Sequence, residues 1–111
     1  MSPPLAGVRV VELATEIAGP YAGKLLADAG AEVIKVGSTA GGDPLRGWTA
    51  CGATVPPGTD APLFRFLNRG KQAIVVDGAS ADGQAQLLAL VAGADVVVQS
   101  PGSGATLAWE S

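Results

Sequence analysis

LAGVRVVELATEIAGPYAGKLLADAGAEVIKVGSTAGGDPLRGW, residues 5–48, is the stretch that says most about the fold. Val8 to Leu13 is a short apolar run rich in β-branched residues, which is typical of a buried strand. A helix is predicted from Pro20 to about Ala29, because proline suits a first helical turn and apolar residues then recur at helical spacing. Val33 to Val36 is predicted to be a second buried strand. Parallel strands need a crossover of this kind, so the stretch predicts one βαβ unit.

The rest of the chain repeats this alternation. Pro62 to Asn68 is predicted to form a short helix, and Ala73 to Val76 a third strand. Ser80 is a plausible N-cap for a helix that covers Gln84 to Ala92, and Val96 to Val98 is predicted to be a fourth strand. The fold class is therefore α/β, with a Rossmann-like open parallel sheet of about four strands and flanking helices. Right-handed crossovers favour the strand order 3-2-1-4.

Three segments fall outside this alternation. Met1 to Pro4 is expected to be a loose lead-in, and Ala105 to Ser111 to begin a further helix. Gly37 to Asp60 is rich in Gly, Pro and Thr and is too long for an ordinary turn. Connections of that length are usually functional or disordered.

Length and composition limit the classes of protein that fit. A chain of 111 residues predicts one domain, residues 1–111. Hydrophobic residues make up 48% and charged residues 15%, so either part of the surface is covered by something else or the source genome is rich in Ala, Gly and Val. A net charge of −3 without a basic block argues against a nucleic-acid partner.

Cysteine and histidine usage narrows the chemistry further. Cys51 is the only cysteine, which predicts no internal disulfide and fits a reduced cytoplasmic setting. With no histidine as well, no metal site is expected. The N-terminus lacks a signal-peptide pattern, and no apolar run is long enough to span a membrane.

Ligands of open parallel sheets bind beyond the carboxyl ends of the strands. Four segments should lie there: Thr15 to Gly19, Gly37 to Asp43, Asp77 to Ala79, and Gln99 to Gly102. Gly19-Pro20 is either a tight turn or an opening that lets phosphate reach free helix amides, and these residues alone leave both readings open.

A nicotinamide dinucleotide is the rival ligand for this architecture. It predicts a GxGxxG pattern after the first strand and an acid at the end of the second. The connector here reads ATEIAGPYAG, and the second strand ends at Val36-Gly37. Dinucleotide binding is therefore disfavoured.

Several phrases of the sequence resemble one enzyme family. They are PLAGVRVVEL, AGPYAGKLLADAGAEVIKV, GGDPLRGW, FLNRGKQAIVVD and GADVVVQSPGSG, in this order. Together they resemble the N-terminal part of the family III CoA-transferases, which include formyl-CoA transferase, carnitine CoA-transferases and α-methylacyl-CoA racemase. The resemblance covers nearly the whole chain.

The resemblance implies that acyl-CoA or coenzyme A is a substrate and that no cofactor is tightly bound. The implied contacts with the CoA moiety are Ile17, Ala18, Ser38, Val76, Asp77, Gly78, Ala79, Ser100, Pro101 and Gly102. Two of these segments depart from the family pattern. Gly37 and Ser38 occupy positions where the family often has glutamate and arginine. Ser100-Pro101 occupies a position where the transferases commonly have an Asn-Phe pair.

Other polar residues near the strand ends are interpreted as structural. Arg46 is expected to pair with Asp43 and brace the loop. Glu12 is expected to turn sideways to a strand neighbour or a helix amide, and Glu16 to be a solvated loop charge. Cys51 has no histidine to activate it, and it is interpreted as a small buried filler.

No catalytic residue is assigned to this chain. The resemblance implies that the nucleophilic aspartate of the transferases, and the histidine and aspartate of the racemases, belong to a later region. It also implies a homodimer, or a longer partner chain that supplies the catalytic region. The alternatives are a non-catalytic subunit or remnant, a racemase-type member, and an unrelated nucleotide-binding module.

Overall fold

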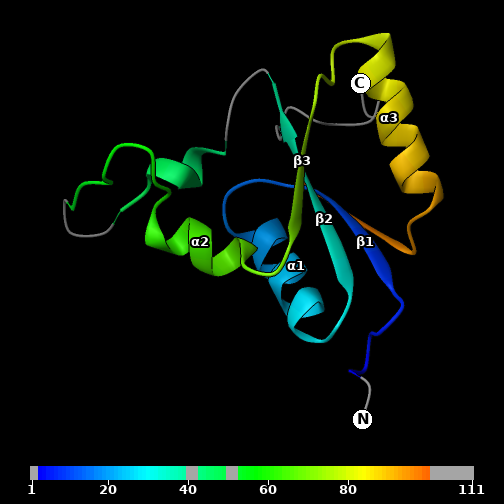
Figure 1. Ribbon diagram of the computed structural model, residues 1–111, viewed down its shortest axis with the longest axis horizontal. Coiled ribbons are helices and arrows are strands. Elements are labelled where there is room, and N and C mark those ends of the chain that lie inside the picture. Colours follow the sequence, from blue (N-terminus) through cyan, green and yellow to red (C-terminus); the bar gives the residue numbers. More distant parts are fainter. Residues whose placement is uncertain (1–2, 40–42, 50–52, 101–111) are drawn as a thin grey trace.

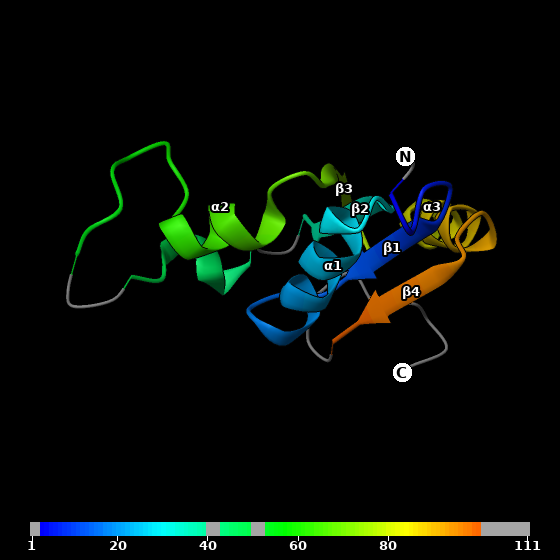
Figure 2. The ribbon, with the colours of Figure 1, turned by 90° about the horizontal axis from the view of Figure 1, so that it is seen from below.

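A computed structural model describes residues 3–39, 43–49 and 53–100. Its sheet has four parallel strands in the order β3-β2-β1-β4 (Figures 1 and 2). The strands are β1 (Arg9–Leu13), β2 (Glu32–Ser38), β3 (Gln72–Val76) and β4 (Val96–Gln99). Both the parallel direction and the order predicted from the sequence are confirmed.

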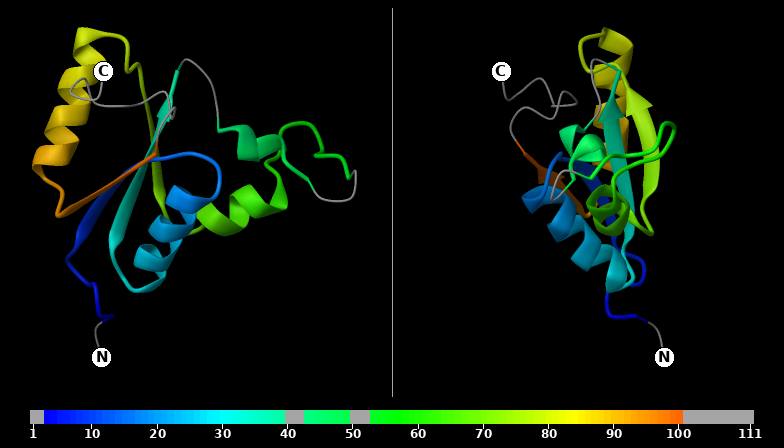
Figure 3. Two further views of the ribbon diagram at one scale, coloured as in Figure 1. Left: turned by 180° about the vertical axis from the view of Figure 1, so that it is seen from behind. Right: turned by 90° about the vertical axis from the view of Figure 1, so that its left-hand side faces the viewer.

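Two helices cover opposite faces of the sheet (Figure 3). The α1 helix (Ala18–Asp28) lies over an apolar cluster that includes Val10 and Val33, and α3 (Ala81–Ala92) lies over one that includes Val11 and Leu87. Successive strand residues point to opposite faces, and Val10 and Val11 are both fully buried. Apolar residues therefore follow one another directly in the central strands because both faces of the sheet are covered there.

The helix starts differ from the sequence-based expectation. The α1 helix begins at Ala18 rather than Pro20, so proline occupies the third helical position, where an amide is not yet needed. The α3 helix begins at Ala81, three residues before Gln84, because the Ser80 hydroxyl accepts a hydrogen bond of 2.9 Å from the amide of Gly83. The predicted N-cap is therefore confirmed.

A small extension projects beyond the sheet (Figure 1). It contains α2 (Pro62–Asn68), with the bounds predicted, and a 3₁₀ helix η1 (Pro44–Gly47) within the connection Gly37 to Asp60, for which no helix is predicted. Leu45, Phe64 and Leu67 form its own buried cluster. Residues 105–111, where a further helix is expected, lie outside the described residues, and so does Cys51.

Candidate functional site

The predicted ligand-binding segments meet at the carboxyl edge of the sheet in two pairs. Ser38 at the end of β2 is in register with Val76 at the end of β3. On the other side, the amide of Thr15 donates to the Ser100 hydroxyl at 3.2 Å, and the amide of Ser100 donates to the Leu13 carbonyl at 3.1 Å. The fold therefore brings the loops after β1 and β4 into contact. Pro101 and Gly102 lie outside the described residues.

The first of these segments leads into α1. Ile17 is the N-cap residue without a side-chain hydrogen bond, its side chain is half exposed, and Ala18 is the first helical residue. A Cβ atom on Gly19 would overlap with the Cβ of Ala14. Gly19 is therefore a packing residue of the first turn of α1, which lies against the loop after β1. It does not itself form the tight turn that was one of the two expectations.

The third segment is a turn braced by its own carboxylate. Asp77 Oδ1 accepts a hydrogen bond of 3.1 Å from the amide of Ala79, and the Asp77 carbonyl accepts one from the amide of Ser80. Gly83 lies against the same carbonyl, where a Cβ atom would not fit. Because Val76 is buried and Asp77 is engaged, this segment offers a ligand mainly backbone groups.

A buried cluster of four charges lies between the sheet and α1. Glu12 is fully buried, with Oε1 2.7 Å from Lys71 Nζ and Oε2 3.0 Å from Lys35 Nζ. Lys35 Nζ also donates to the Ala14 carbonyl at 2.9 Å and lies 3.6 Å from Asp43 Oδ2. Two acids and two lysines balance, so each buried charge has a partner. Glu12 thus turns to a strand neighbour, one of the two partners expected for it.

Lys71 is the member of this cluster that the sequence reading missed. Its ammonium group also donates to the Pro20 carbonyl and to Asn68 Oδ1, each at 2.9 Å. Burial lowers the pKa of Lys71 below its ordinary value, although the hydrogen bond and charge of Glu12 act in the opposite direction. No local pattern marks a lysine in a turn as buried, whereas its partner Glu12, an acid inside a β-branched run, was a signal that a cation was needed.

The expected pair between Arg46 and Asp43 is wrong. Arg46 binds both carboxylate oxygens of Asp60 at 2.8 Å and stacks 4.2 Å from the centre of the Phe64 ring. Asp43 instead points inward, where Oδ1 accepts hydrogen bonds from the amides of Glu16 and Leu45. Arg46 still braces the loop, but through the partner at the far end of it.

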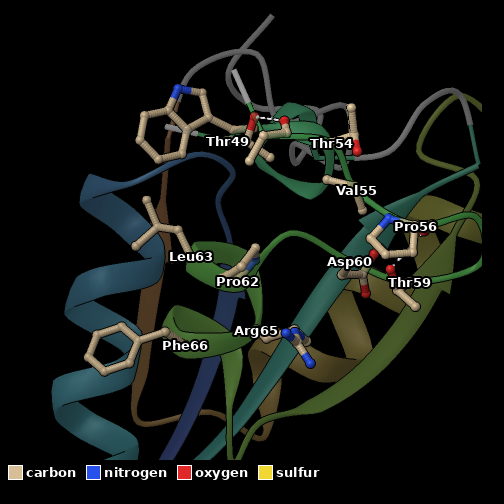
Figure 4. A pocket seen from close by; sticks show the side chains of 12 residues that line it. Thr49, Thr54, Val55, Pro56, Thr59, Asp60, Pro62, Leu63, Arg65 and Phe66 are labelled. Carbon is tan, nitrogen blue, oxygen red and sulfur yellow. Dashed lines mark hydrogen bonds between the residues drawn. The ribbon is translucent and has the colours of Figure 1, made fainter. Parts of the chain in front are cut away.

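Two hollows share Trp48, and the smaller one also borders the loop after β1. One of about 230 Å³ is lined by Glu16, Ile17, Pro44, Leu45 and Trp48. A larger one of about 610 Å³ extends from Trp48 along α2, where Leu63 and Phe66 point toward α1 (Figure 4). Trp48 borders both hollows. These walls suit an apolar group more than a charged one.

The described part of the chain contains neither a cluster of metal-binding side chains nor a helix of membrane-spanning length and apolarity. No group of three or more His, Cys, Asp and Glu side chains there could hold a metal ion. Within the same residues, no helix has the length and apolar character needed to cross a membrane.

Comparison with known proteins gives the family. The model of CoA-transferase family III matches residues 5–110. The chain belongs to this family. It is 45% identical over 100 residues to succinate–glutarate CoA-transferase of Agrobacterium fabrum, covering 88% of this chain and 25% of the relative. It is 34% identical over 107 residues to the alpha subunit of succinyl-CoA–L-malate CoA-transferase of Chloroflexus aurantiacus, covering 96% and 24%.

Solved structures agree with the assignment. A CAIB/BAIF family protein from Brucella suis superimposes with a TM-score of 0.75 at 43% identity, over 87% of this chain and 25% of that protein. The chain therefore spans about a quarter of the length of the relatives it matches. It corresponds to the N-terminal lobe of family III CoA-transferases, and the resemblance read from the sequence is confirmed.

Proposed function

We propose that this lobe contributes to binding the CoA moiety of an acyl-CoA, in an enzyme that transfers CoA to a carboxylic acid acceptor. The observation that carries the proposal is the family match over residues 5–110. It is supported by the meeting of the loops that follow β1 and β4 at the carboxyl edge of the sheet. In open parallel sheets that edge is where ligands bind.

The proposed contacts are mostly backbone groups. Ile17 and Ala18 would present the opening of α1, and the turn after Val76 would present peptide groups while the Asp77 carboxylate holds its shape. The remaining proposed contacts are Ser38, Gly78, Ala79, Ser100, Pro101 and Gly102. No residue of this chain is proposed as catalytic. The racemase alternative stays a hypothesis, because the residues that would distinguish a racemase from a transferase are also not among those assigned here.

Relatives named for succinate, glutarate and malate suggest the substrate class to test first. Succinyl-CoA is therefore our first choice of acyl donor, with dicarboxylic acids as acceptors. We place the assembled enzyme in the cytoplasm, as a homodimer or with a longer partner chain.

Titration calorimetry with coenzyme A tests the proposal. We expect binding weaker than micromolar, because Ser38 cannot replace the bidentate phosphate contacts of an arginine. Ser38→Arg should tighten binding about ten- to a hundredfold, the range of one charge-assisted contact. Gln72→Arg adds the same charge at the opposite, amino end of the adjacent strand and should leave affinity unchanged. Submicromolar binding by the unmodified chain, or equal effects of both variants, would contradict this account of the edge.

A second candidate function is that of a non-catalytic subunit, and an exposed surface favours it. Ile17, Tyr21 and Leu25 follow one another at four-residue spacing along α1, and all are about half exposed. Phe66 is also exposed beside them, with Lys24 Nζ 4.5 Å from its ring centre. A stripe of this kind suits a protein partner. Co-expression with the remaining three-quarters of a family III subunit tests it. A chain that stays monomeric and does not bind that fragment would contradict it.

A further inference from the structure

The loop between β1 and α1 contains a residue in a costly conformation. Glu16 has φ +69°, and it is the only non-glycine residue with positive φ among those that the structure describes. Side chains with a Cβ atom rarely adopt this region, so the surroundings must impose it. The Glu16 side chain is exposed, which points to the backbone as the part that is held.

Asp43 holds that backbone from a distant part of the chain. Its Oδ1 atom accepts hydrogen bonds from the amide of Glu16 at 2.9 Å and from the amide of Leu45 at 3.0 Å. Asp43 is buried, with 8% of its surface exposed. One carboxylate oxygen therefore ties the loop after β1 to the segment that begins η1.

Lys35 orients Asp43 and fixes the end of β1 at the same time. Its Nζ atom lies 3.6 Å from Asp43 Oδ2, and it donates to Glu12 Oε2 at 3.0 Å and to the Ala14 carbonyl at 2.9 Å. Glu12 near the end of β1 and Asp43, which accepts the loop amide, thus share one cation. Hydrogen bonds to a charged group are stronger than those between neutral groups.

We propose that Asp43, oriented by Lys35, is a positioning residue that sets the conformation in which Ile17 and Ala18 meet a ligand. The ligand half of this inference rests on the proposed function, whereas the loop half rests on the contacts of Asp43 alone. Asp43 acts through the backbone of Glu16 and does not touch the ligand itself.

Amide hydrogen exchange followed by NMR, on the full 111-residue chain, tests the loop half. Asp43→Ala should lower the protection of the Glu16 amide roughly ten- to a hundredfold, the loss of one hydrogen bond to a charged group. Asp43→Asn keeps an acceptor oxygen but loses the ion pair with Lys35, so its effect should be smaller and in the same direction. The Val11 amide in the central strand should stay protected in both variants and reports that the fold persists.

Calorimetry with coenzyme A on the same variants tests the ligand half. Asp43→Ala should weaken binding at least about tenfold, Asp43→Asn less, in the order of their Glu16 protection. Asp28→Ala removes the same charge from an exposed site on α1, where Asp28 pairs with Lys24, and should change neither measurement.

The outcomes separate the two halves. Unchanged protection of Glu16 in Asp43→Ala would overturn the positioning role, and so would lost protection with unchanged affinity. If Asp43→Ala does not fold, unchanged Glu16 protection in Asp43→Asn overturns it, and a severalfold loss supports it. Failure of the unmodified chain to bind coenzyme A would contradict the proposed function, while the exchange measurement would still decide whether Asp43 holds the loop.

Discussion

Gly23→Ala should change the free energy of unfolding through two opposing effects. Helix propensity predicts that the variant is more stable, whereas packing against the buried charge cluster predicts that it is less stable. Gly23 lies inside α1 and is buried. Alanine in place of a helical glycine ordinarily stabilises a protein by about 0.5–1 kcal/mol. At this site, however, the added Cβ would overlap with Oε1 of Glu12 and lie 3.1 Å from Lys71 Nζ.

The magnitude follows from what must move. The Glu12 carboxylate is fully buried, and its other oxygen is held by Lys35 at 3.0 Å, so moving it aside breaks ion pairs that solvent cannot replace. Separating a buried ion pair costs about 3–5 kcal/mol, and subtracting the helix gain leaves a net loss of about 2–4 kcal/mol. For a chain of this size the midpoint of thermal unfolding should fall by roughly 10–20 °C.

Urea unfolding followed by circular dichroism measures the difference in the free energy of unfolding. Gly47→Ala is the matched control, because an added Cβ there has no atom within 4 Å, and it should stay within about 0.5 kcal/mol of the unmodified chain. In a Glu12→Ala background the penalty of Gly23→Ala should become much smaller, since the Glu12 oxygen that overlaps with the added Cβ is gone and only the 3.1 Å approach to Lys71 Nζ remains. A Gly23→Ala chain as stable as the original, or more stable, would refute the claim that the cluster is tightly packed.

Three further predictions can be checked with the same chain. Ser80→Ala removes the N-cap hydrogen bond to Gly83 and should cost about 1 kcal/mol of unfolding free energy in urea, whereas an effect on α3 no larger than the experimental error would contradict the cap. Lys71 has a pKa lowered from 10.5 by burial, so as the pH rises the native state releases the Lys71 proton before the unfolded state does. Its contribution to stability should therefore rise with pH in the alkaline range below 10.5, and Lys71→Met should flatten that rise; identical slopes would speak against the shift. The purified chain alone should catalyse no acyl transfer, because covalent catalysis needs an activated nucleophile and none is assigned here. Intact mass spectrometry after incubation with succinyl-CoA should show no acyl or CoA adduct, and an adduct on any aspartate of the chain would overturn the assignment.

The fold was predictable because its signals are local. Val10, Val11 and Val33 belong to short β-branched runs bounded by turn residues, and such runs place buried strands without any knowledge of their partners. Strand order then followed from the handedness of crossovers. The same locality explains the errors. Ala18 starts α1 earlier than Pro20 suggests because the packing of Gly19 on Ala14, a tertiary contact, fixes the first turn.

The interior of the site was less predictable because its contacts join distant parts of the chain. Glu12 and Lys71 are 59 positions apart by their numbers, and nothing in the word LNRGKQ marks its lysine as buried. Arg46 was paired with the nearest acid, whereas the loop closes on Asp60 instead. Charge alone gives several possible partners, and only the path of the backbone selects among them.

The four-charge cluster also constrains how this lobe could be recombined with its relatives. Its members come from four separate segments, at positions 12, 35, 43 and 71. A chimaera joined anywhere between Glu12 and Lys71 would combine charges from two parent proteins in one buried cluster. A mismatch there would leave a buried ion without a counterion. A junction after Lys71 keeps all four from one parent. The turn at Asp77 and Gly78, just past the end of β3, is thus the first turn after the cluster at which a gene fusion keeps all four charges together.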